Sequence, residues 1–398
     1  MVRSLSSLLA VLFMSLFIGA CGGSDDNGSG SASGGSDDPQ MAEIAAEIEK
    51  YSQVPEYQDP EPGTSFDAKQ AKGKTIFSIP ISSDIPFINA IEDAQQKIAK
   101  SLGIKYISFK NQGTPDEWVR GMNQAIAQKV DLIILSALPN PADLQPQIKK
   151  ARAAGIPVIS TNGPDPEKYP PNTVPAAGTA NLTSYVPGPF VKAAALQADW
   201  VINDSGGKAN VLILTANDVL SAKGHSTMVE QEFKRRCPEC KTKMIDTPVT
   251  DWATKIQTKV QTELSKDPSI NYIVPIYSAM GVYAQPAITA SGRRGQVKIV
   301  TYDGDTGALK HVQDGSDIKV VVGESAEWAA YAFMDRAMRI LLDLPYPEKG
   351  GDPHIGIRIF TPDNVDEAGK PPVFEKGYGD AFKDGYAKLW QLDSPPTE

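Results

Sequence analysis

Polar and aromatic side chains follow several apolar stretches of this 398-residue chain. The first group, in "ISSDIPF", contains Asp84 and Phe87, and later groups contain Asp303 in "TYDGD" and Glu324 in "VGES". An ionised carboxylate accepts charge-assisted hydrogen bonds from two neighbouring hydroxyls, while an aromatic face covers the apolar C–H side of a sugar-like ring. These residue types favour a site for a small polar molecule, and the three acids would also suit a basic or amine-bearing one.

Two further aromatic residues, Trp252 and Tyr277, are candidates for the same site, but most of these candidates also have a structural interpretation. Aspartate is a favoured helix N-cap, so Asp84 can cap the helix that follows it. Trp252 can be a core residue of its own lobe, and Tyr277 can simply line a cleft. The "YDGD" segment around Asp303 can be a turn. The sequence leaves these alternatives open.

The chain lacks the sequence signatures of an enzyme or a nucleic-acid-binding protein. Its histidines, His225, His311 and His354, lie in unrelated elements. There is neither a Gly-x-Ser-x-Gly nucleophile elbow nor a glycine-rich phosphate loop after a strand. A net charge of −9 argues against nucleic acid, because phosphate binding needs a clustered basic surface. We therefore expect no catalytic residue, cofactor or metal site.

The elements that position the candidate residues alternate between strand and helix. The pattern begins with a strand over 75–82, a helix over 86–103 and a second strand, "IKYISFKN". It continues to the helical stretch "AEWAAYAFMDRAMRILLDL". Nearly all-apolar strands in such alternation predict parallel sheets covered on both faces, and there are too many strands for one simple sheet. We predict an α/β protein with two doubly wound lobes, whose ligands bind beyond the carboxyl ends of the strands.

The N-terminus indicates export. Arg3 precedes a 17-residue run, "SLSSLLAVLFMSLFIGA", which is short for a membrane span but suits a signal peptide over 1–20. The run ends in "IGAC", which resembles the bacterial lipobox, so cleavage is expected before Cys21 and lipidation on it. A plain secretory signal with an incidental cysteine is the alternative. Residues 21–40 are poor in apolar side chains and predict a flexible tether, and 41–73 predict an extension that packs along the main body.

Cys237 and Cys240 form a Cys-Pro-Glu-Cys segment. Outside the cytoplasm such a pair most often closes as a disulfide. A zinc site would need two more ligands, and a thioredoxin-like motif should open a helix, whereas this segment follows the helical "VEQEFKRR". The disulfide is favoured, with redox chemistry and metal binding as alternatives.

From about residue 74 to about 390, the sequence resembles the ribose/galactose class of sugar-binding proteins, the solute receptors of ABC importers with the type I periplasmic binding fold. The resemblance rests on the order of "SDIPFINAIEDA", "GIPVISTN", "VKIVTYDGD" and "IKVVVGESAEWAAYAFMDRAM". It implies two lobes joined by a three-segment hinge, with crossovers near 178–181, 322–324 and 358–362. The lobes expected from it are 74–178 with 325–357, and 179–324 with 358–392.

The resemblance also assigns roles to some candidate residues. It implies that Phe87 stacks on a sugar ring and that Asp303 accepts hydrogen bonds from hydroxyls. Trp252 falls close to a family aromatic residue on the second lobe. Glu324 stands where the family commonly has glutamine.

Other positions depart from the family pattern. Asn162, followed by glycine, replaces an Asp-Arg pair, so an expected arginine is missing. Tyr277, followed by serine, replaces Asn-Asp. A family arginine on a helix aligns only loosely with Lys223 or His225.

The resemblance therefore implies an extracytoplasmic, lipid-anchored and monomeric receptor that performs no chemistry. It would bind one small molecule, a monosaccharide or close relative, and deliver it to an ABC permease. Two alternatives remain open from the sequence: a non-sugar ligand such as an amine or another small polar compound, and a receptor that serves a membrane sensor.

The lipobox predicts the effect of Cys21→Ala. Because the thiol is the acylation site, the variant should be released from membranes or remain unprocessed. Membrane fractionation and mass determination of the mature N-terminus measure this. A variant that is acylated and processed like the wild type would contradict the anchor.

Overall fold

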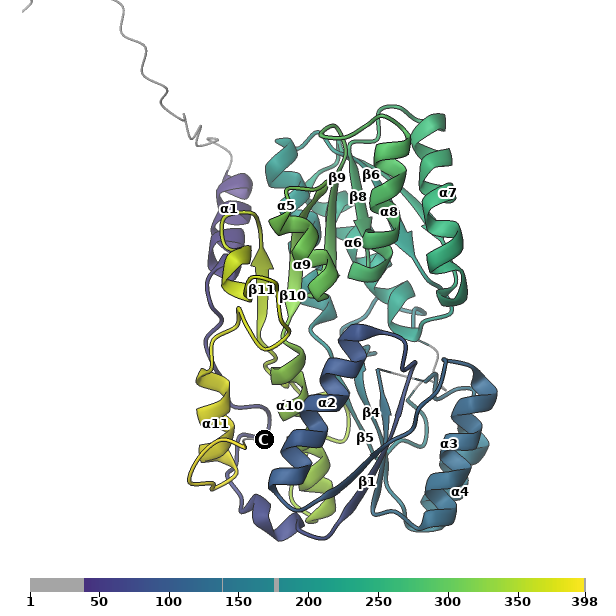
Figure 1. Ribbon diagram of the computed structural model, residues 1–398, viewed down its shortest axis with the longest axis vertical. Helices are drawn as coiled ribbons and strands as arrows, with labels where there is room; N and C mark the ends of the chain where they lie inside the picture. The colour runs from purple at the N-terminus through teal and green to yellow at the C-terminus, as the bar shows by residue number, and fades with distance from the viewer. Residues whose placement is uncertain (1–38, 138, 175–178, 397–398) are drawn as a thin grey trace, which may run out of the picture. The chain divides into compact units, whose positions relative to one another are not determined.

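The computed structural model describes residues 39–137, 139–174 and 179–396, and in them the chain alternates between strands and helices that form two lobes (Figure 1). The expected signal peptide, the lipidation site Cys21 and nearly all of the expected tether lie outside these described residues. Within them, no helix combines the length and apolar character needed to cross a membrane.

The first lobe contains a five-stranded parallel sheet in the order β2-β1-β3-β4-β5. Successive side chains of a strand point to opposite faces. Accordingly, Ile76 packs toward α2 and α10, and Phe77 packs toward α3 and α4. The strands are β1 (Thr75–Pro80), β2 (Lys105–Ser108), β3 (Leu132–Ser136), β4 (Val158–Gly163) and β5 (Ser184–Pro187). The helices are α2 (Pro86–Ser101), α3 (Pro115–Gln128), α4 (Gln145–Ala153) and α10 (Ala326–Leu341).

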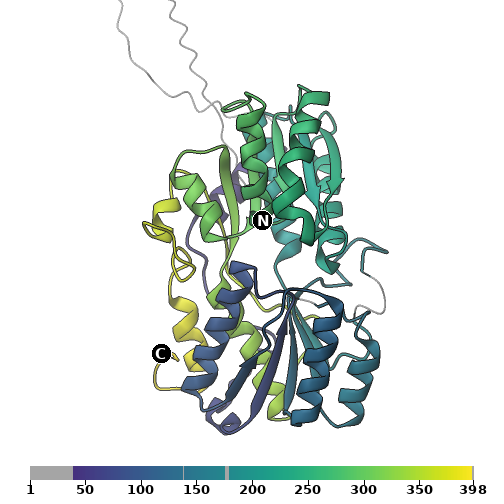
Figure 2. The same cartoon turned by 45° about the vertical axis from the view of Figure 1, so that its right-hand side comes forward.

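The second lobe contains a six-stranded sheet in the order β11-β10-β9-β8-β6-β7. Helices α7, α8 and α9 cover one face, and α5 and α6 cover the other (Figures 1 and 2). The strands are β6 (Asn210–Thr215), β7 (Lys241–Asp246), β8 (Tyr272–Pro275), β9 (Lys298–Asp303), β10 (Ile318–Glu324) and β11 (Ile357–Phe360). The helices are α5 (Phe190–Ser205), α6 (Leu220–Arg236), α7 (Trp252–Lys266), α8 (Ser278–Ala290) and α9 (Thr306–Gln313).

The fold confirms the predicted doubly wound lobes, and it differs from the sequence-based expectation at one edge strand. β11 pairs antiparallel to β10, whereas all other pairs are parallel. β10 runs toward the first lobe and passes directly into α10. The chain then returns from α10 and must run along the sheet in the opposite direction.

The crossovers between the lobes also differ from the expected positions. β5 belongs to the first sheet, so the first crossover is 188–189 and not 178–181. β5 is the short segment "SYVP", whose four residues show too little periodicity to distinguish strand from helix in the sequence. The second crossover is at Ser325, close to the expected place. The third is 342–356, ahead of β11.

Both ends of the described chain pass from one lobe to the other. Helix α1 (Pro39–Ser52) packs on α5 and β11, with Ile44 buried in the second lobe. Residues 53–65 then lead to Phe66 in the core of the first lobe. At the other end, α11 (Ala381–Leu389) lies beside α10 (Figure 1). Its aromatic side chains join the first-lobe core. The resemblance placed all of 358–392 in the second lobe, but the part from α11 onward packs with the first lobe.

Cys237 and Cys240 are joined by a disulfide just after α6. The bond connects the end of α6 to the start of β7, two elements that pack in the same lobe. Three short 3-10 helices complete the description: Ala68–Ala71, Val249–Asp251 and Val365–Ala368.

A buried ion pair joins α10 to both chain ends. Arg339 Nε donates to Asp335 Oδ2 at 2.7 Å, and both side chains are almost fully buried. Trp390 Nε1 donates to the other Asp335 oxygen at 2.9 Å. Arg339 Nη2 also donates to the carbonyl of Thr64 at 2.7 Å. One carboxylate thus coordinates the packing of three segments that are distant in sequence.

We predict that Asp335→Ala destabilises the protein by about 3–5 kcal/mol, because it leaves a buried guanidinium and a buried indole N–H without their acceptor. Asp314→Ala is the matched control, since it removes an exposed ion pair with Lys310 and should change the free energy of unfolding by less than about 0.5 kcal/mol. Denaturant unfolding of both variants measures the difference. Equal losses in the two variants would contradict the role of the buried pair.

Candidate functional site

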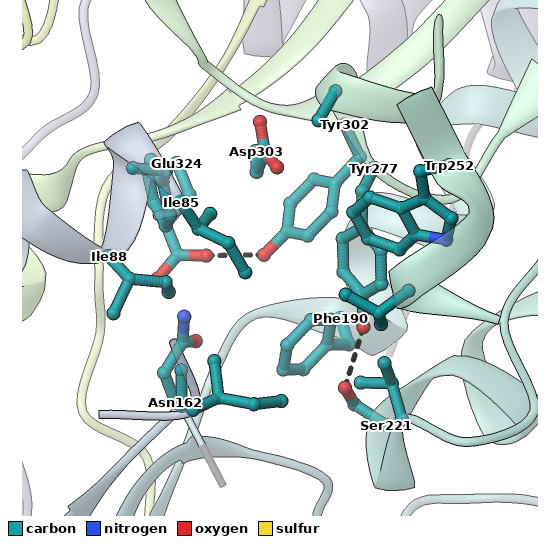
Figure 3. Close-up of a pocket in the computed structure, with 16 residues that line it drawn as sticks. Ile85, Ile88, Asn162, Phe190, Ser221, Trp252, Tyr277, Tyr302, Asp303 and Glu324 are labelled. Carbon is teal, nitrogen blue, oxygen red and sulfur yellow. Dashed lines mark hydrogen bonds between the residues drawn. The ribbon is translucent and has the colours of Figure 1, made fainter. Parts of the chain in front are cut away.

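A pocket lies between the two lobes, at the carboxyl ends of their strands (Figure 3). In sheets of this order the strands diverge at a switch point, β1 and β3 in the first lobe and β6 and β8 in the second, and the loops there leave room for a ligand. The wall consists of Ile81, Ile85, Phe87, Ile88, Ala137, Asn162, Phe190, Val219, Ser221, Val249, Trp252, Tyr277, Ala279, Tyr302, Asp303 and Glu324.

Aromatic rings make up much of the pocket wall. Trp252 and Tyr277 lie 6.0 Å apart between ring centroids, and Phe190 meets Tyr302 edge-on at 5.6 Å. The indole N–H of Trp252 donates to the carbonyl of Thr247 at 2.9 Å, which satisfies its polar atom. Consequently the ring can present an apolar face to the pocket.

Tyrosine hydroxyls in the wall have partners within the protein. The Tyr277 hydroxyl lies 2.7 Å from the Ser221 hydroxyl, as the dashed line in Figure 3 shows. The Tyr302 hydroxyl donates to Glu324 Oε2. These bonds hold both rings in place, and the bond from Tyr302 uses its hydroxyl donor while its oxygen can still accept a hydrogen bond.

Glu324 is the most deeply buried acid of the pocket, with 1% of its surface exposed. Its second oxygen, Oε1, has no hydrogen-bond partner among the described residues. Burial raises the pKa of Glu324 to about 8, and the hydrogen bond from Tyr302 only partly opposes that shift. The carboxyl group is therefore mostly protonated at neutral pH while the pocket is empty.

Asp303 lies at the end of β9, the neighbour of β10, and its backbone partner is Gly323. Its carboxyl accepts a hydrogen bond from the Asp305 amide at 3.1 Å. Burial, followed by the nearby charge of Asp305, raises the pKa of Asp303 well above its usual range. Two carboxyl groups on adjacent strand ends thus share a desolvated site.

Two pocket residues have left-handed backbone conformations, which side-chain-bearing residues rarely adopt. Asp303 has φ = 102° and Asn162 has φ = 48°. Such strain persists where surrounding contacts hold it, and it concentrates at ligand sites. Beside Asn162, Gly188 of the first crossover has no space for a side chain, because an added Cβ would lie 2.2 Å from Asn162 Oδ1.

No lysine, arginine or histidine contributes to the pocket wall in the described part of the chain. Lys223 is exposed on α6 and lies outside the wall. His225 is fully buried behind the pocket, stacked on Tyr302 at 5.3 Å, and its Nε2 lies 2.7 Å from Gln197 Oε1. Burial lowers the pKa of His225 to about 3, so the imidazole is a neutral packing group.

The structure brings together most of the residues that the sequence analysis singled out. Asp84 is exposed and outside the wall, and it does not cap α2, whose N-cap is Ile85. Lys223 is the other candidate residue that lies outside the wall. Those in the wall are Phe87, Asn162, Trp252, Tyr277, Asp303 and Glu324.

Sequence reasoning missed several wall residues. Phe190 was hidden because the strand before it was not recognised, so its position directly after a strand end could not be seen. Tyr302 precedes Asp303 in the same strand, and strand alternation alone would point the two side chains apart. The apolar residues Ile85, Ile88, Val219 and Val249 carried no chemical signal that distinguishes them from core residues.

The cavity between these side chains measures about 60 Å³. On this measure a single water needs roughly 10–15 Å³, so the space holds only a few water molecules. A ring-sized ligand can enter only if the lobes separate or the wall side chains turn.

The buried carboxyl group predicts a pH dependence of stability. The pKa of Glu324 in the folded protein lies above its usual value of 4.5. The stability that its protonated form contributes is therefore fully present below about pH 4.5 and is lost as the pH rises through about 8. The ligand-free Glu324→Gln variant should therefore gain stability relative to the wild type as the pH rises from about 4.5 to about 8, by on the order of a few kcal/mol, and the difference should stay constant above that. Asp303 is present in both proteins, so its contribution to the pH dependence of stability cancels when the variant is compared with the wild type. Melting temperatures measured across this range test it, and parallel curves would contradict the raised pKa.

Comparison with known proteins identifies related folds. The chain matches the periplasmic binding protein domain family over residues 76–342, while no curated protein sequence matches it. A sugar ABC transporter subunit from Rhodobacter sphaeroides is 21% identical, with 74% of this chain and 99% of that chain covered and a TM-score of 0.63.

Two further solved structures are similar. A solute-binding protein from Actinobacillus succinogenes with bound D-allose is 20% identical over 74% of this chain and 99% of its own, with a TM-score of 0.64. A glucose-galactose binding protein from Geobacillus stearothermophilus is 20% identical over the same shares, with a TM-score of 0.61. At this identity the structures establish the shared fold, and the family match covers more than half of the chain. The chain therefore belongs to the periplasmic binding protein family, whose members are extracytoplasmic solute-binding proteins and not enzymes.

Proposed function

We propose that this protein is the solute-binding subunit of an ABC importer and that it holds one monosaccharide between its lobes for delivery to a membrane permease. The observation that carries the proposal is the pocket at the switch points of both sheets, where aromatic faces and buried acceptors meet. An aromatic ring covers the C–H face of a sugar, and a buried oxygen without a partner needs a donor from the ligand.

The relatives support this ligand size and class. One similar structure contains D-allose, and another, from Agrobacterium vitis, contains alpha-D-tagatopyranose. A third similar protein is a glucose-galactose binding protein. These ligands are all single sugar rings, which fits a pocket that is formed by a few side chains from each lobe.

Delivery requires the pocket to open and close. Its 60 Å³ volume excludes a sugar ring while the lobes are in the described arrangement. The crossovers at 188–189, 325 and 342–356 lie between the lobes and are where the backbone would bend. Periplasmic binding proteins are a standard example of closure about a hinge.

The N-terminal sequence supports a lipid anchor for this receptor. We propose that the anchor is at Cys21 and that a flexible tether links it to α1. The monomeric binding domain would then be held near the membrane, either in the periplasm or at the outer face of the cytoplasmic membrane. A tether of low hydrophobicity gives the domain freedom to reach a permease in the same membrane.

Phe87→Ala tests the pocket. Truncation of this ring, which is 3% exposed and belongs to the wall, should weaken sugar binding about tenfold, since aromatic stacking contributes about 0.5–1.5 kcal/mol beyond burial. Phe374→Ala is the matched control, because that ring packs on Phe87 at 6.2 Å but is outside the wall.

A thermal-shift screen of pentoses, hexoses and polyols first selects the sugar, and calorimetry then compares the variants. A ligand at about a hundred times its dissociation constant adds about 2.7 kcal/mol of stability, which the screen detects readily. Unchanged affinity in Phe87→Ala, or an equal loss in Phe374→Ala, would show that the ligand binds elsewhere.

A further inference from the structure

The pocket wall has an unbalanced charge composition. It contains two carboxyl groups, Asp303 and Glu324, and within the described residues it contains no cationic side chain. Burial raises the pKa values of both acids, and the charge of Asp305 adds to the shift of Asp303. Hydrogen bonds from Ser278 to Asp303 and from Tyr302 to Glu324 partly oppose these shifts, and no cation contributes to either. Two desolvated acids without a counterion are costly in the ionised state, so a ligand that brings a positive charge would remove that cost.

Charged and titratable groups approach these acids from several elements, and none neutralises them. Tyr302, Tyr277, Tyr169 and Tyr378 are phenols whose pKa values are raised, and they stay neutral. Arg358 is a buried cation on β11, the strand that pairs with β10, and its backbone partner is Gly323, next to Glu324. Its Nε donates to the carbonyl of Ser52 at 2.9 Å. Its Nη1 donates to the carbonyl of Gly377 at 2.6 Å and pairs with Glu367 at 2.8 Å, so these two nitrogens are engaged outside the pocket wall.

Two buried oxygens in the pocket wall lack hydrogen-bond donors. Glu324 Oε1 and Asn162 Oδ1 have no hydrogen-bond partner among the residues described. Glu324 is 1% exposed and Asn162 is 6% exposed. Figure 3 shows Asn162 and Glu324 on the same side of the pocket, with the Asn162 amide nitrogen directed toward the Glu324 carboxyl. A buried polar group without a partner is unfavourable, and a ligand N–H group would satisfy Asn162 Oδ1 and, once the carboxyl is ionised, Glu324 Oε1.

The remaining wall also suits a cation. Aromatic faces attract ammonium groups through the ring quadrupole, most strongly when the site is desolvated. Trp252, Tyr277 and Phe190 lie across the pocket from Glu324 (Figure 3), and Phe87 adds a further ring to the wall. An anionic ligand would find no cationic side chain among the described wall residues and would face two carboxyl groups.

We infer that the ligand carries an ammonium group on a compact ring, as an amino sugar does, and that this group binds between the carboxyl of Glu324 and the aromatic wall. The inference rests on the proposed function, because it names the chemical class of the solute that the same pocket takes. It predicts selection against neutral and acidic sugars of the same ring size.

Binding of an ammonium group should release protons from the protein. The empty site holds Glu324 protonated at neutral pH, and a cation beside it lowers the pKa of the carboxyl, which then ionises. We expect release of up to about one proton per ligand at pH 7, less the fraction taken up by amine that is neutral in solution. The affinity should rise with pH until the carboxyl of the empty site ionises or the amine of the ligand loses its proton. A neutral sugar leaves the carboxyl protonated and releases none.

The test compares ligands that differ in charge at one position of the same ring. Calorimetry at pH 7, in two buffers of different ionisation enthalpy, is run with glucose, glucosamine and N-acetylglucosamine, with the corresponding galactose series, and with cyclohexylamine as an amine without hydroxyls. At least one amino sugar should bind ten times or more tighter than both its parent sugar and its N-acetyl form. Its heat should depend on the buffer.

Glu324→Gln keeps the size of the side chain and removes its ability to ionise. It should abolish both the preference for the amine and the proton release, while Asp314→Asn, an exposed acid of the same lobe, should leave both unchanged. Melting curves of the empty variants show that they fold. If Glu324→Gln does not fold, the wild-type ligand series decides the question without it.

The outcomes separate this inference from the proposed function. Equal or tighter binding of a neutral sugar would overturn the inference and leave the sugar-receptor proposal intact. Binding of cyclohexylamine with proton release, but of no sugar, would support the ammonium site and overturn the monosaccharide proposal. Binding of none of these probes would overturn both.

Discussion

Parallel strands all end at the same edge of their sheet, and this constraint determines where the protein can bind a ligand. Each lobe turns the carboxyl ends of its strands toward the other lobe, so the loops after β1, β4, β8 and β9 meet in one place although they are far apart in sequence. Backbone amides and polar side chains at strand ends are not used by the sheet. The same geometry therefore concentrates both the free polar groups and the strained backbone of Asp303 and Asn162 at the pocket.

The connections between the lobes go beyond a three-segment hinge. α1 packs on the second lobe, the following segment enters the core of the first, and α11 packs beside α10. Arg358 links the second-lobe sheet to both of these outer segments through the carbonyls of Ser52 and Gly377. Opening of the pocket must therefore bend five chain passages and preserve or exchange these contacts, which limits the motion to directions that all five allow.

The chemistry of the pocket differs from that of the buried ion pair on α10. There Asp335 is paired with Arg339, because an unpaired ion in the interior is unfavourable. In the pocket, Glu324 and Asp303 have no such partner, and their pKa values are raised instead. A binding protein needs its partner to arrive from outside. An incomplete network is consistent with that requirement, while a complete one would leave nothing for the solute to supply.

The sequence by itself determined the fold class and much of the site. Apolar strands in alternation with amphipathic helices dictate doubly wound sheets. Residues at the carboxyl ends of the strands, such as Asp303 and Glu324, or at the start of the next helix, such as Phe87, had to lie at that edge of the sheets. Only the tertiary structure decided which of these residues converge. Asp84 and Phe87 are three residues apart, yet the first turn of α2 buries Phe87 in the pocket and leaves Asp84 in solvent. The antiparallel β11, the short β5 that hid Phe190, and the packing of α11 on the first lobe likewise depend on long-range contacts. Local periodicity contains no information on those contacts, because it reports which face of an element is buried and not what buries it.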